Sequence, residues 1–146
     1  MKFILGLGSN LGNKSENLTL AITLICEEIG RVTEISNFFK SKPSGFLSTN
    51  DFLNCCISLE TGFSPQKLLK AIKCIEKKMG RHYSSKGYED RIIDIDIVLS
   101  EIKIFNSKLI VPHPRYINRD FVLVPLGELT GFPDPSTFMI SSQLLR

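Results

Sequence analysis

Residues 90–99 have the sequence DRIIDIDIVL, in which apolar and acidic side chains alternate along a strand predicted from residue 93 to residue 99. Successive side chains of a strand point to opposite faces. One face is expected to be apolar and to consist of Ile93, Ile95, Ile97 and Leu99. The other face would carry Asp94 and Asp96. This strand should therefore pack on a core and present two carboxylates on its opposite side.

The rest of the chain surrounds this strand with elements in a regular order. Strands are also predicted at residues 2–7, 32–39 and 52–59, and helices at residues 15–29 and 64–79. Ser15 and Ser64 should cap the two helices, and Gly30 and Gly80 should end them. The order is strand, helix, strand, strand, helix, strand. It predicts an α+β fold, a ferredoxin-like βαββαβ core sandwich with extra short strands and helices at the C-terminal end.

Size and composition fit one compact domain of an ordinary globular protein. The chain has 146 residues, 42% of them hydrophobic, and a net charge of +3. That charge suits anionic ligands and falls short of the dense basic patch of a nucleic-acid binder. We expect no membrane span and a cytoplasmic, monomeric protein. The four cysteines should be reduced and buried, and the neighbours Cys55 and Cys56 should point to opposite sides of the sheet.

Asp94 and Asp96 are the strongest indication of chemistry. Neighbouring carboxylates about 6 Å apart repel by roughly 3 kcal/mol at an effective dielectric near 20. Divalent cations reverse that repulsion, and carboxylate oxygens are ligands that Mg²⁺ prefers. One or two Mg²⁺ ions bridging ATP phosphates would use this pair. The alternative is an edge strand whose outer face is merely acidic and solvated.

Basic side chains flank the acidic strand in sequence. They are Arg81, His82, Lys86 and Arg91 upstream, and Lys108, His113, Arg115 and Arg119 downstream. Phosphoryl transfer needs this mixture of charges, because the protein mainly positions phosphates and neutralises their charge. Taken alone, each of these cations is better explained as a solvated surface charge, and it is their concentration around one acidic strand that favours a functional site. The glycines near the N-terminus match neither a Rossmann fingerprint nor a Walker loop, so ATP would not be held by a standard P-loop.

Four blocks of sequence together resemble the 6-hydroxymethyl-7,8-dihydropterin pyrophosphokinase family. They are residues 8–12 (GSNLG), 51–54 (DFLN), 90–97 (DRIIDIDI), and 111–115 (VPHPR) with 118–123 (NRDFVL). The resemblance covers nearly the whole chain and implies a single pyrophosphokinase domain, residues 1–146. It implies transfer of a diphosphate from ATP to the hydroxymethyl group of the pterin, release of AMP, and a place in folate biosynthesis.

The resemblance also implies roles for particular residues. Asp94 and Asp96 match the ligands of two Mg²⁺ ions, and with Arg81 and Arg91 they form the expected catalytic set. The expected ATP-binding residues are Glu76, Arg81, Arg91, Ile97, Lys108, His113 and Arg119. The expected pterin-binding residues are Ser41, Ser44, Phe52, Asn54, Tyr88 and Phe121. The two phenylalanines would enclose the pterin between their rings, and the Asn54 amide suits the mixed donor and acceptor edge of a pterin.

The sequence departs from the family at three positions. Tyr83 stands where many relatives have an arginine, Tyr88 where a tryptophan is frequent, and Lys42 where a proline is frequent. We hypothesise that residues 40–50 and 81–90 form lids over the bound phosphates. Two alternatives have no catalytic role: an RNA-binding module with the same order of elements, and a regulatory domain of this fold. The strand at residues 52–59 lacks the aromatic pattern of an RNA-recognition motif.

Overall fold

The computed structural model describes residues 1–43, 48–81 and 90–130. Its strands are β1 (Lys2–Ser9), β2 (Arg31–Ile35), β3 (Phe39–Ser41), β4 (Phe52–Glu60), β5 (Asp94–Ser100), β6 (Ile104–Phe105) and β7 (Ile110–Val111). Its helices are α1 (Lys14–Glu28), α2 (Pro65–Lys78), a 3₁₀ turn (Tyr116–Asn118) and α3 (Asp120–Leu126). The predicted α+β class and order of elements are confirmed, and within these residues no helix is long and apolar enough to cross a membrane.

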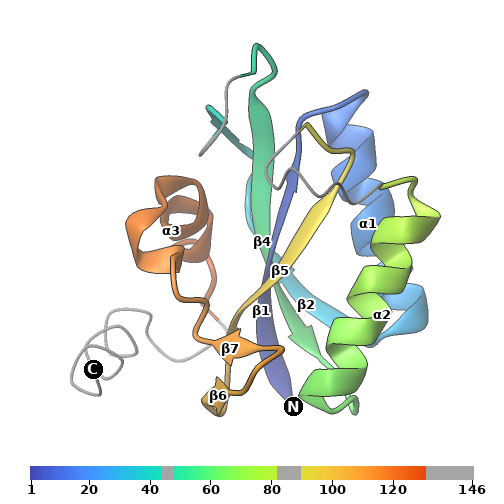
Figure 1. The fold of residues 1–146 in the computed structure, drawn as a ribbon, viewed down its shortest axis with the longest axis vertical. Coiled ribbons are helices and arrows are strands. Elements are labelled where there is room, and N and C mark those ends of the chain that lie inside the picture. The colour runs from blue at the N-terminus through green and yellow to red at the C-terminus, as the bar shows by residue number, and fades with distance from the viewer. Residues whose placement is uncertain (44–47, 82–89, 131–146) are drawn as a thin grey trace.

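The main sheet has the strand order β2-β4-β1-β5, and β3 continues along the β2 edge of β4. All of its pairings are antiparallel. Helices α1 and α2 cover one face, and α3 covers part of the other (Figure 1). This is the ferredoxin-like arrangement with an added helical layer. Because α3 covers only part of its face, the sheet keeps room there for a site.

The predicted strand 32–39 is two strands in the structure. Residues 36–38 interrupt it, and the pairing with β4 resumes at Phe39. The Ser36 side chain accepts a hydrogen bond from the Cys56 amide at 2.9 Å, and the Asn37 amide donates to Glu128 at 2.7 Å. These contacts with distant segments replace regular pairing, which explains why local periodicity did not reveal the break.

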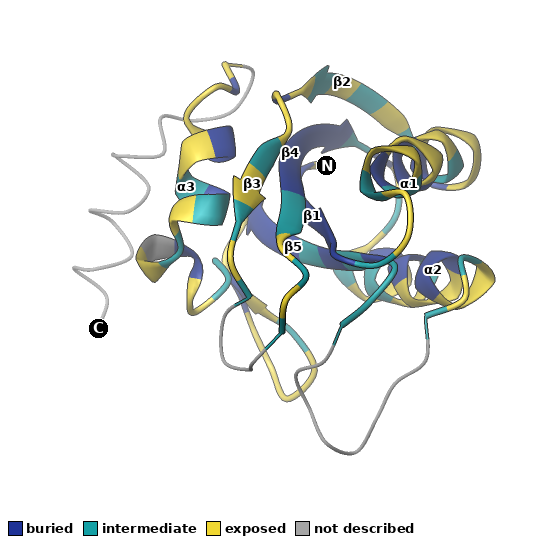
Figure 2. Ribbon diagram, turned by 90° about the horizontal axis from the view of Figure 1, so that it is seen from above, coloured by how far each residue is buried: buried dark blue, intermediate teal, exposed yellow. Residues whose placement is uncertain are grey.

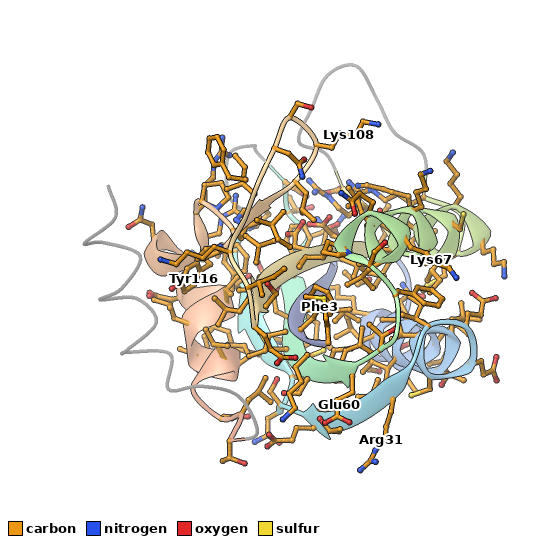
Figure 3. All side chains as sticks on the ribbon, turned by 90° about the horizontal axis from the view of Figure 1, so that it is seen from below. Phe3, Arg31, Glu60, Lys67, Lys108 and Tyr116 are labelled. Carbon is orange, nitrogen blue, oxygen red and sulfur yellow. The ribbon has the colours of Figure 1, made fainter. Side chains whose placement is uncertain are left out.

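Two hydrophobic clusters lie on opposite faces of the sheet. The helix-side cluster contains Phe3, which is fully buried at its centre (Figure 3), together with Ile93, Ile95 and Ile97. The α3-side cluster consists of Ile4, Cys56, Val98, Leu99, Tyr116, Val122, Leu126 and Leu129. In Figure 2 buried residues, in dark blue, are concentrated on the strands of the sheet and on the sides of α1 and α2 that face it, and exposed residues, in yellow, lie on the outer sides of these helices.

Leu99 lies on the face opposite to the predicted one. The register between β1 and β5 shifts between Ile4 and Leu5: Leu5 pairs with Ile97, whereas Ile4 pairs with Leu99. Val98 is therefore an extra residue, which is a β-bulge. The bulge breaks the alternation between Val98 and Leu99, which both face α3, so the last part of β5 joins the α3-side cluster.

The helix ends are close to their predicted positions, with one correction. Ser64 caps α2 as predicted, accepting a hydrogen bond from the Lys67 amide at 3.2 Å. Helix α1 is capped by Asn13 and not by Ser15, because the Asn13 side chain accepts from the Glu16 amide at 3.2 Å. Gly80, with φ of +94°, follows the end of α2.

The cysteines fulfil the prediction only in part. All four are free thiols. Cys55 and Cys56 are buried on opposite faces of the sheet, as predicted, and burial raises the pKa of the Cys55 thiol to about 12. Cys26 and Cys74 are exposed, contrary to the prediction, because both lie outside the buried stripes of their helices.

Candidate active site

A cleft lies on the α3 side of the sheet, and its floor is built from two rows of paired residues. In the first row Gly8 of β1 pairs with Asn54 on one side and Asp94 on the other. In the second row Gly6 pairs with Cys56 and with Asp96. All six residues line the cleft. The central strand thus contributes no side chains to the floor, which leaves the two carboxylates on one side of an open strip and Asn54 on the other.

The glycine at position 8 allows neighbouring side chains to approach β1 closely. A Cβ atom there would lie 3.1 Å from the Asn54 Oδ1 and 3.4 Å from the Phe52 ring. An added Cβ would therefore crowd these two side chains and require Asn54 to shift by a few tenths of an ångström.

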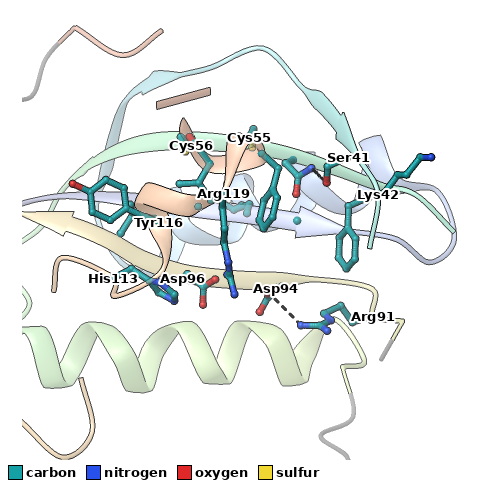
Figure 4. A pocket seen from close by; sticks show the side chains of 18 residues that line it. Ser41, Lys42, Cys55, Cys56, Arg91, Asp94, Asp96, His113, Tyr116 and Arg119 are labelled. Carbon is teal, nitrogen blue, oxygen red and sulfur yellow. Dashed lines mark hydrogen bonds and ion pairs between the residues drawn. The ribbon is translucent and has the colours of Figure 1, made fainter. Parts of the chain in front are cut away.

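Asp94 and Asp96 point into the same part of the cleft (Figure 4). Asp94 Oδ1 accepts a hydrogen bond from Arg81 Nη1 at 2.8 Å, and Oδ2 lies 3.5 Å from Arg91 Nη1. Burial, and next the negative charge of Asp94, raise the pKa of Asp96 to about 7. The two carboxylates are therefore close enough to repel, and a bound cation would relieve that repulsion.

Glu76 lies beneath this carboxylate pair and is fully buried. Its Oε2 accepts from Arg81 Nη1 at 2.7 Å and from the Ile95 amide at 2.9 Å. Lys73 Nζ lies 3.5 Å from its other oxygen. Glu76 consequently fixes both the Arg81 guanidinium and the backbone between the two aspartates, and it is not part of the cleft lining.

His113 lies beside Asp96, with its backbone amide donating to the Val98 carbonyl of β5 at 2.9 Å, and Arg119 extends towards the carboxylates from the start of α3 (Figure 4). The His113 Nδ1 accepts the Arg115 amide at 3.2 Å, so the neutral ring carries its proton on Nε2. Burial, and next the charge of Arg119, lower the pKa of His113. A neutral imidazole donor and a guanidinium beside two carboxylates suit a phosphate chain held by a cation.

Two aromatic rings and two cations line the remaining walls. The Arg91 guanidinium lies 5.7 Å from the Phe52 ring centroid, and that of Arg119 lies 5.5 Å from the Phe121 centroid. Asn54 Nδ2 donates to the Phe39 carbonyl and to Ser41 Oγ, both at 2.9 Å. These bonds hold the Asn54 amide in place above Gly8.

Nine of the predicted catalytic and binding residues line this one cleft. They are Ser41, Phe52, Asn54, Arg91, Asp94, Asp96, His113, Arg119 and Phe121. Lys42 lies at the rim with its amine directed away from the carboxylates (Figure 4). Arg81 contacts Asp94 from beneath the lining.

Several predicted residues are placed elsewhere or not described. The Ile97 side chain lies in the helix-side cluster, since alternation directs it away from Asp96. Lys108 is exposed near the β6–β7 hairpin, outside the cleft lining (Figure 3). Ser44, Tyr83 and Tyr88 fall outside the described residues, as does most of the 81–90 loop.

Other lining residues were not predicted as site residues. Gly6, Val98, Tyr116 and Val122 complete the floor and the far wall. The alternation of Gly6 and Gly8 in a strand was the available signal, because two glycines on one face leave a gap in a layer.

The carboxylate pair alone does not make a metal site. Over residues 1–43, 48–81 and 90–130, no three His, Cys, Asp or Glu side chains gather closely enough to hold a metal ion. Mg²⁺ commonly takes one or two carboxylates and completes its shell with substrate phosphates and water. The pair fits that kind of site.

Comparison with known proteins gives consistent matches over most of the chain. The family model described as 7,8-dihydro-6-hydroxymethylpterin-pyrophosphokinase matches residues 4–131. A 2-amino-4-hydroxy-6-hydroxymethyldihydropteridine pyrophosphokinase from Porphyromonas gingivalis is 38% identical over 135 residues, 90% of this chain and 92% of that protein. Its namesake from Aquifex aeolicus is 40% identical over 126 residues, 86% of this chain and 78% of that protein. A folate synthesis bifunctional protein from Arabidopsis thaliana is 38% identical over 132 residues, which is 27% of its own length.

Proposed function

This chain belongs to the 7,8-dihydro-6-hydroxymethylpterin-pyrophosphokinase family, and from that premise we propose that it transfers the diphosphate of ATP to the hydroxymethyl group of 6-hydroxymethyl-7,8-dihydropterin. As a pyrophosphokinase of this family it acts in folate biosynthesis. The observation that carries the proposal is the two-row floor, with Asn54 and the aspartates on either side of the glycines. Such a strip lets one group hold a substrate ring while another group receives phosphates.

The pterin would bind at the Phe52 side of the cleft. Phe52 and Phe121 offer aromatic faces, and stacking contributes about 0.5–1.5 kcal/mol per pair beyond the buried area. Asn54 and Ser41 lie at the same end and would hydrogen-bond the polar edge of the pterin. Orientation at this end would direct the hydroxymethyl group across the glycine strip towards the aspartates.

The phosphates would lie over Asp94 and Asp96. These two carboxylates would hold the Mg²⁺ that enters with ATP, and that ion supplies neutralisation of phosphate charge. Arg91, His113 and Arg119 line the same region and would donate hydrogen bonds to phosphate oxygens. In the proposed reaction the hydroxyl oxygen of the pterin would bond to the β-phosphorus, and the bond from that phosphorus to the oxygen bridging the α- and β-phosphates would break. AMP would leave with the bridging oxygen, and the proton of the alcohol would pass to solvent. The protein contributes positioning and charge compensation.

An RNA-binding role fits this cleft less well. RNA-recognition modules of this topology stack bases on the open face of the sheet. Here α3 packs against part of that face, and Asp94 and Asp96 line much of the rest. Their negative charge would repel a phosphate backbone that brings no divalent ion.

The test is nucleotide analysis of a reaction with ATP, the pterin and Mg²⁺, with each component left out in turn. We expect AMP to form only when all three are present, and Asp94→Asn and Asp96→Asn to reduce its rate by at least 100-fold. Glu27→Gln, which removes a charge from the exposed end of α1, is the control. Formation of ADP, or AMP formation that does not need the pterin, would refute the proposal.

A further inference from the structure

Three segments that are far apart in sequence meet at Asn10, beside the cleft. Asn10 is almost fully buried. Its backbone amide donates to the Arg91 carbonyl at 3.0 Å, and its side-chain Oδ1 accepts from the backbone amide of Arg91 at 2.7 Å. Its Nδ2 donates to Asp90 Oδ1 at 2.7 Å. The turn after β1 therefore holds the main chain of Arg91 at both its amide and its carbonyl.

Asp90 extends this junction to the segment before β4. Its Oδ1 also accepts from Ser48 Oγ at 2.6 Å, and its Oδ2 accepts from Asn50 Nδ2 at 2.9 Å. The Asn50 amide in turn donates to Ser48 Oγ at 3.1 Å. The Asp90 carboxylate thus accepts hydrogen bonds from three neutral donors on two other segments. Hydrogen bonds to an ionised acceptor are stronger than those between neutral groups. These bonds, that of Ser48 foremost, lower the pKa of Asp90.

Arg91 is the next residue, and it contacts both ends of the cleft. Its guanidinium lies 5.7 Å from the Phe52 ring centroid and 3.5 Å from Asp94 Oδ2. A long side chain that must reach an aromatic wall and a carboxylate together depends on where its backbone starts. The hydrogen bonds of Asn10 and Asp90 fix that starting point.

We propose that Asp90 is a positioning residue that joins the segment at residues 48–50 to Arg91, and so aligns the pterin side of the cleft with the phosphate side. The catalytic half of this inference rests on the proposed function. The structural half rests only on the contacts of Asn10, Ser48, Asn50 and Asp90.

Amide hydrogen exchange measured by NMR tests the structural half. The reporters are the amides of Asn50 and Arg91, which bond to Ser48 Oγ and Asn10 Oδ1 and not to Asp90 itself. Asp90→Asn keeps the shape and removes the charge. We expect it to accelerate exchange at both amides by about tenfold. Asp51→Asn, a matched loss of charge at an exposed side chain, should leave both rates unchanged. Acceleration at neither amide, or at only one of them, would overturn the proposed link.

A double-mutant cycle on kcat/KM tests the catalytic half. If Asp90 acts through Arg91, Asp90→Asn should lower kcat/KM about tenfold in the natural sequence and less than twofold in an Arg91→Ala background. An equal factor in both backgrounds would show that Asp90 does not act through Arg91. If the natural sequence itself yields no AMP, the proposed function fails, and the two exchange rates alone then decide whether Asp90 joins the segments.

Discussion

Replacement of Glu76 should reveal how strongly one buried carboxylate holds the site together. Its side chain is fully buried, and its Oε2 serves two donors, Arg81 Nη1 and the Ile95 amide. The Arg81 side chain is only 14% exposed, so water cannot readily replace the lost partner. Glu76→Gln keeps the size and one acceptor oxygen, removes the charge, and replaces the other oxygen by an NH₂ group.

The magnitude follows from these contacts. A hydrogen bond to a charged group contributes about 1.5–3 kcal/mol and a neutral one about 0.5–1.5 kcal/mol. Two bonds that each lose about 1 kcal/mol give a loss of about 2 kcal/mol for Glu76→Gln. Glu76→Ala leaves the guanidinium and the Ile95 amide without this acceptor, which should cost about 3–5 kcal/mol.

Urea unfolding followed by far-ultraviolet circular dichroism measures this loss. In a thermal scan followed by the same signal, a decrease of about 2 kcal/mol in the free energy of unfolding should lower the melting temperature by roughly 4–8 °C for a chain of this size. Glu27→Gln on the exposed end of α1 is the control and should change stability by less than about 0.5 kcal/mol. If Glu76→Gln is as stable as this control, Glu76 does not hold Arg81 and β5 as described.

Three further predictions concern the floor and walls of the cleft. The folded pKa of Asp96, about 7, lies above its ordinary value of 3.8, so without Mg²⁺ its contribution to stability declines as pH rises from about 4 to about 7. In urea titrations the free energy of unfolding of Asp96→Asn should therefore exceed that of the natural protein by roughly 2–4 kcal/mol at pH 8. At pH 4 the two values should be nearly equal. Gly8→Ala should weaken pterin binding at least tenfold in a fluorescence titration, whereas Gly62→Ala, where an added Cβ meets nothing within 4 Å, should leave it unchanged. The imidazole of His113 should titrate below 6.5 by NMR, and its midpoint should rise in Arg119→Gln; a midpoint above 6.5 would contradict the buried environment described.

The sequence predicted the order of elements well because the apolar periods are local. The same alternation predicted that Asp94 and Asp96 lie together on one face, and both line the cleft on the α3 side of the sheet. The predicted face of Leu99 was wrong because a bulge depends on the pairing of β1 with β5, and local alternation carries no information about that pairing. The break at residues 36–38 likewise depends on contacts with Cys56 and Glu128.

The candidate site was predictable where strands carry it. Asn54 and Asp94 both pair with Gly8, so their proximity follows from the strand order. The burial of Glu76 also left a signal, because it follows Ile72 and Ile75 on the apolar stripe of α2 and is a charged residue in a core position. The junction at Asp90 left none, since Asn10, Ser48 and Asn50 reach it from separate turns.

The side-chain-free strip formed by Gly6 and Gly8 makes the stability of this protein depend on its ligands. Helices α1 and α2 complete one face of the sheet, and α3 completes only part of the other (Figure 2). A molecule bound above the glycines would act as the missing portion of that layer. At 100 times its dissociation constant it would add about 2.7 kcal/mol to the free energy of unfolding. The lifetime of the chain against heat and proteases should therefore rise and fall with the supply of its substrates, which turns a melting curve into a measure of occupancy.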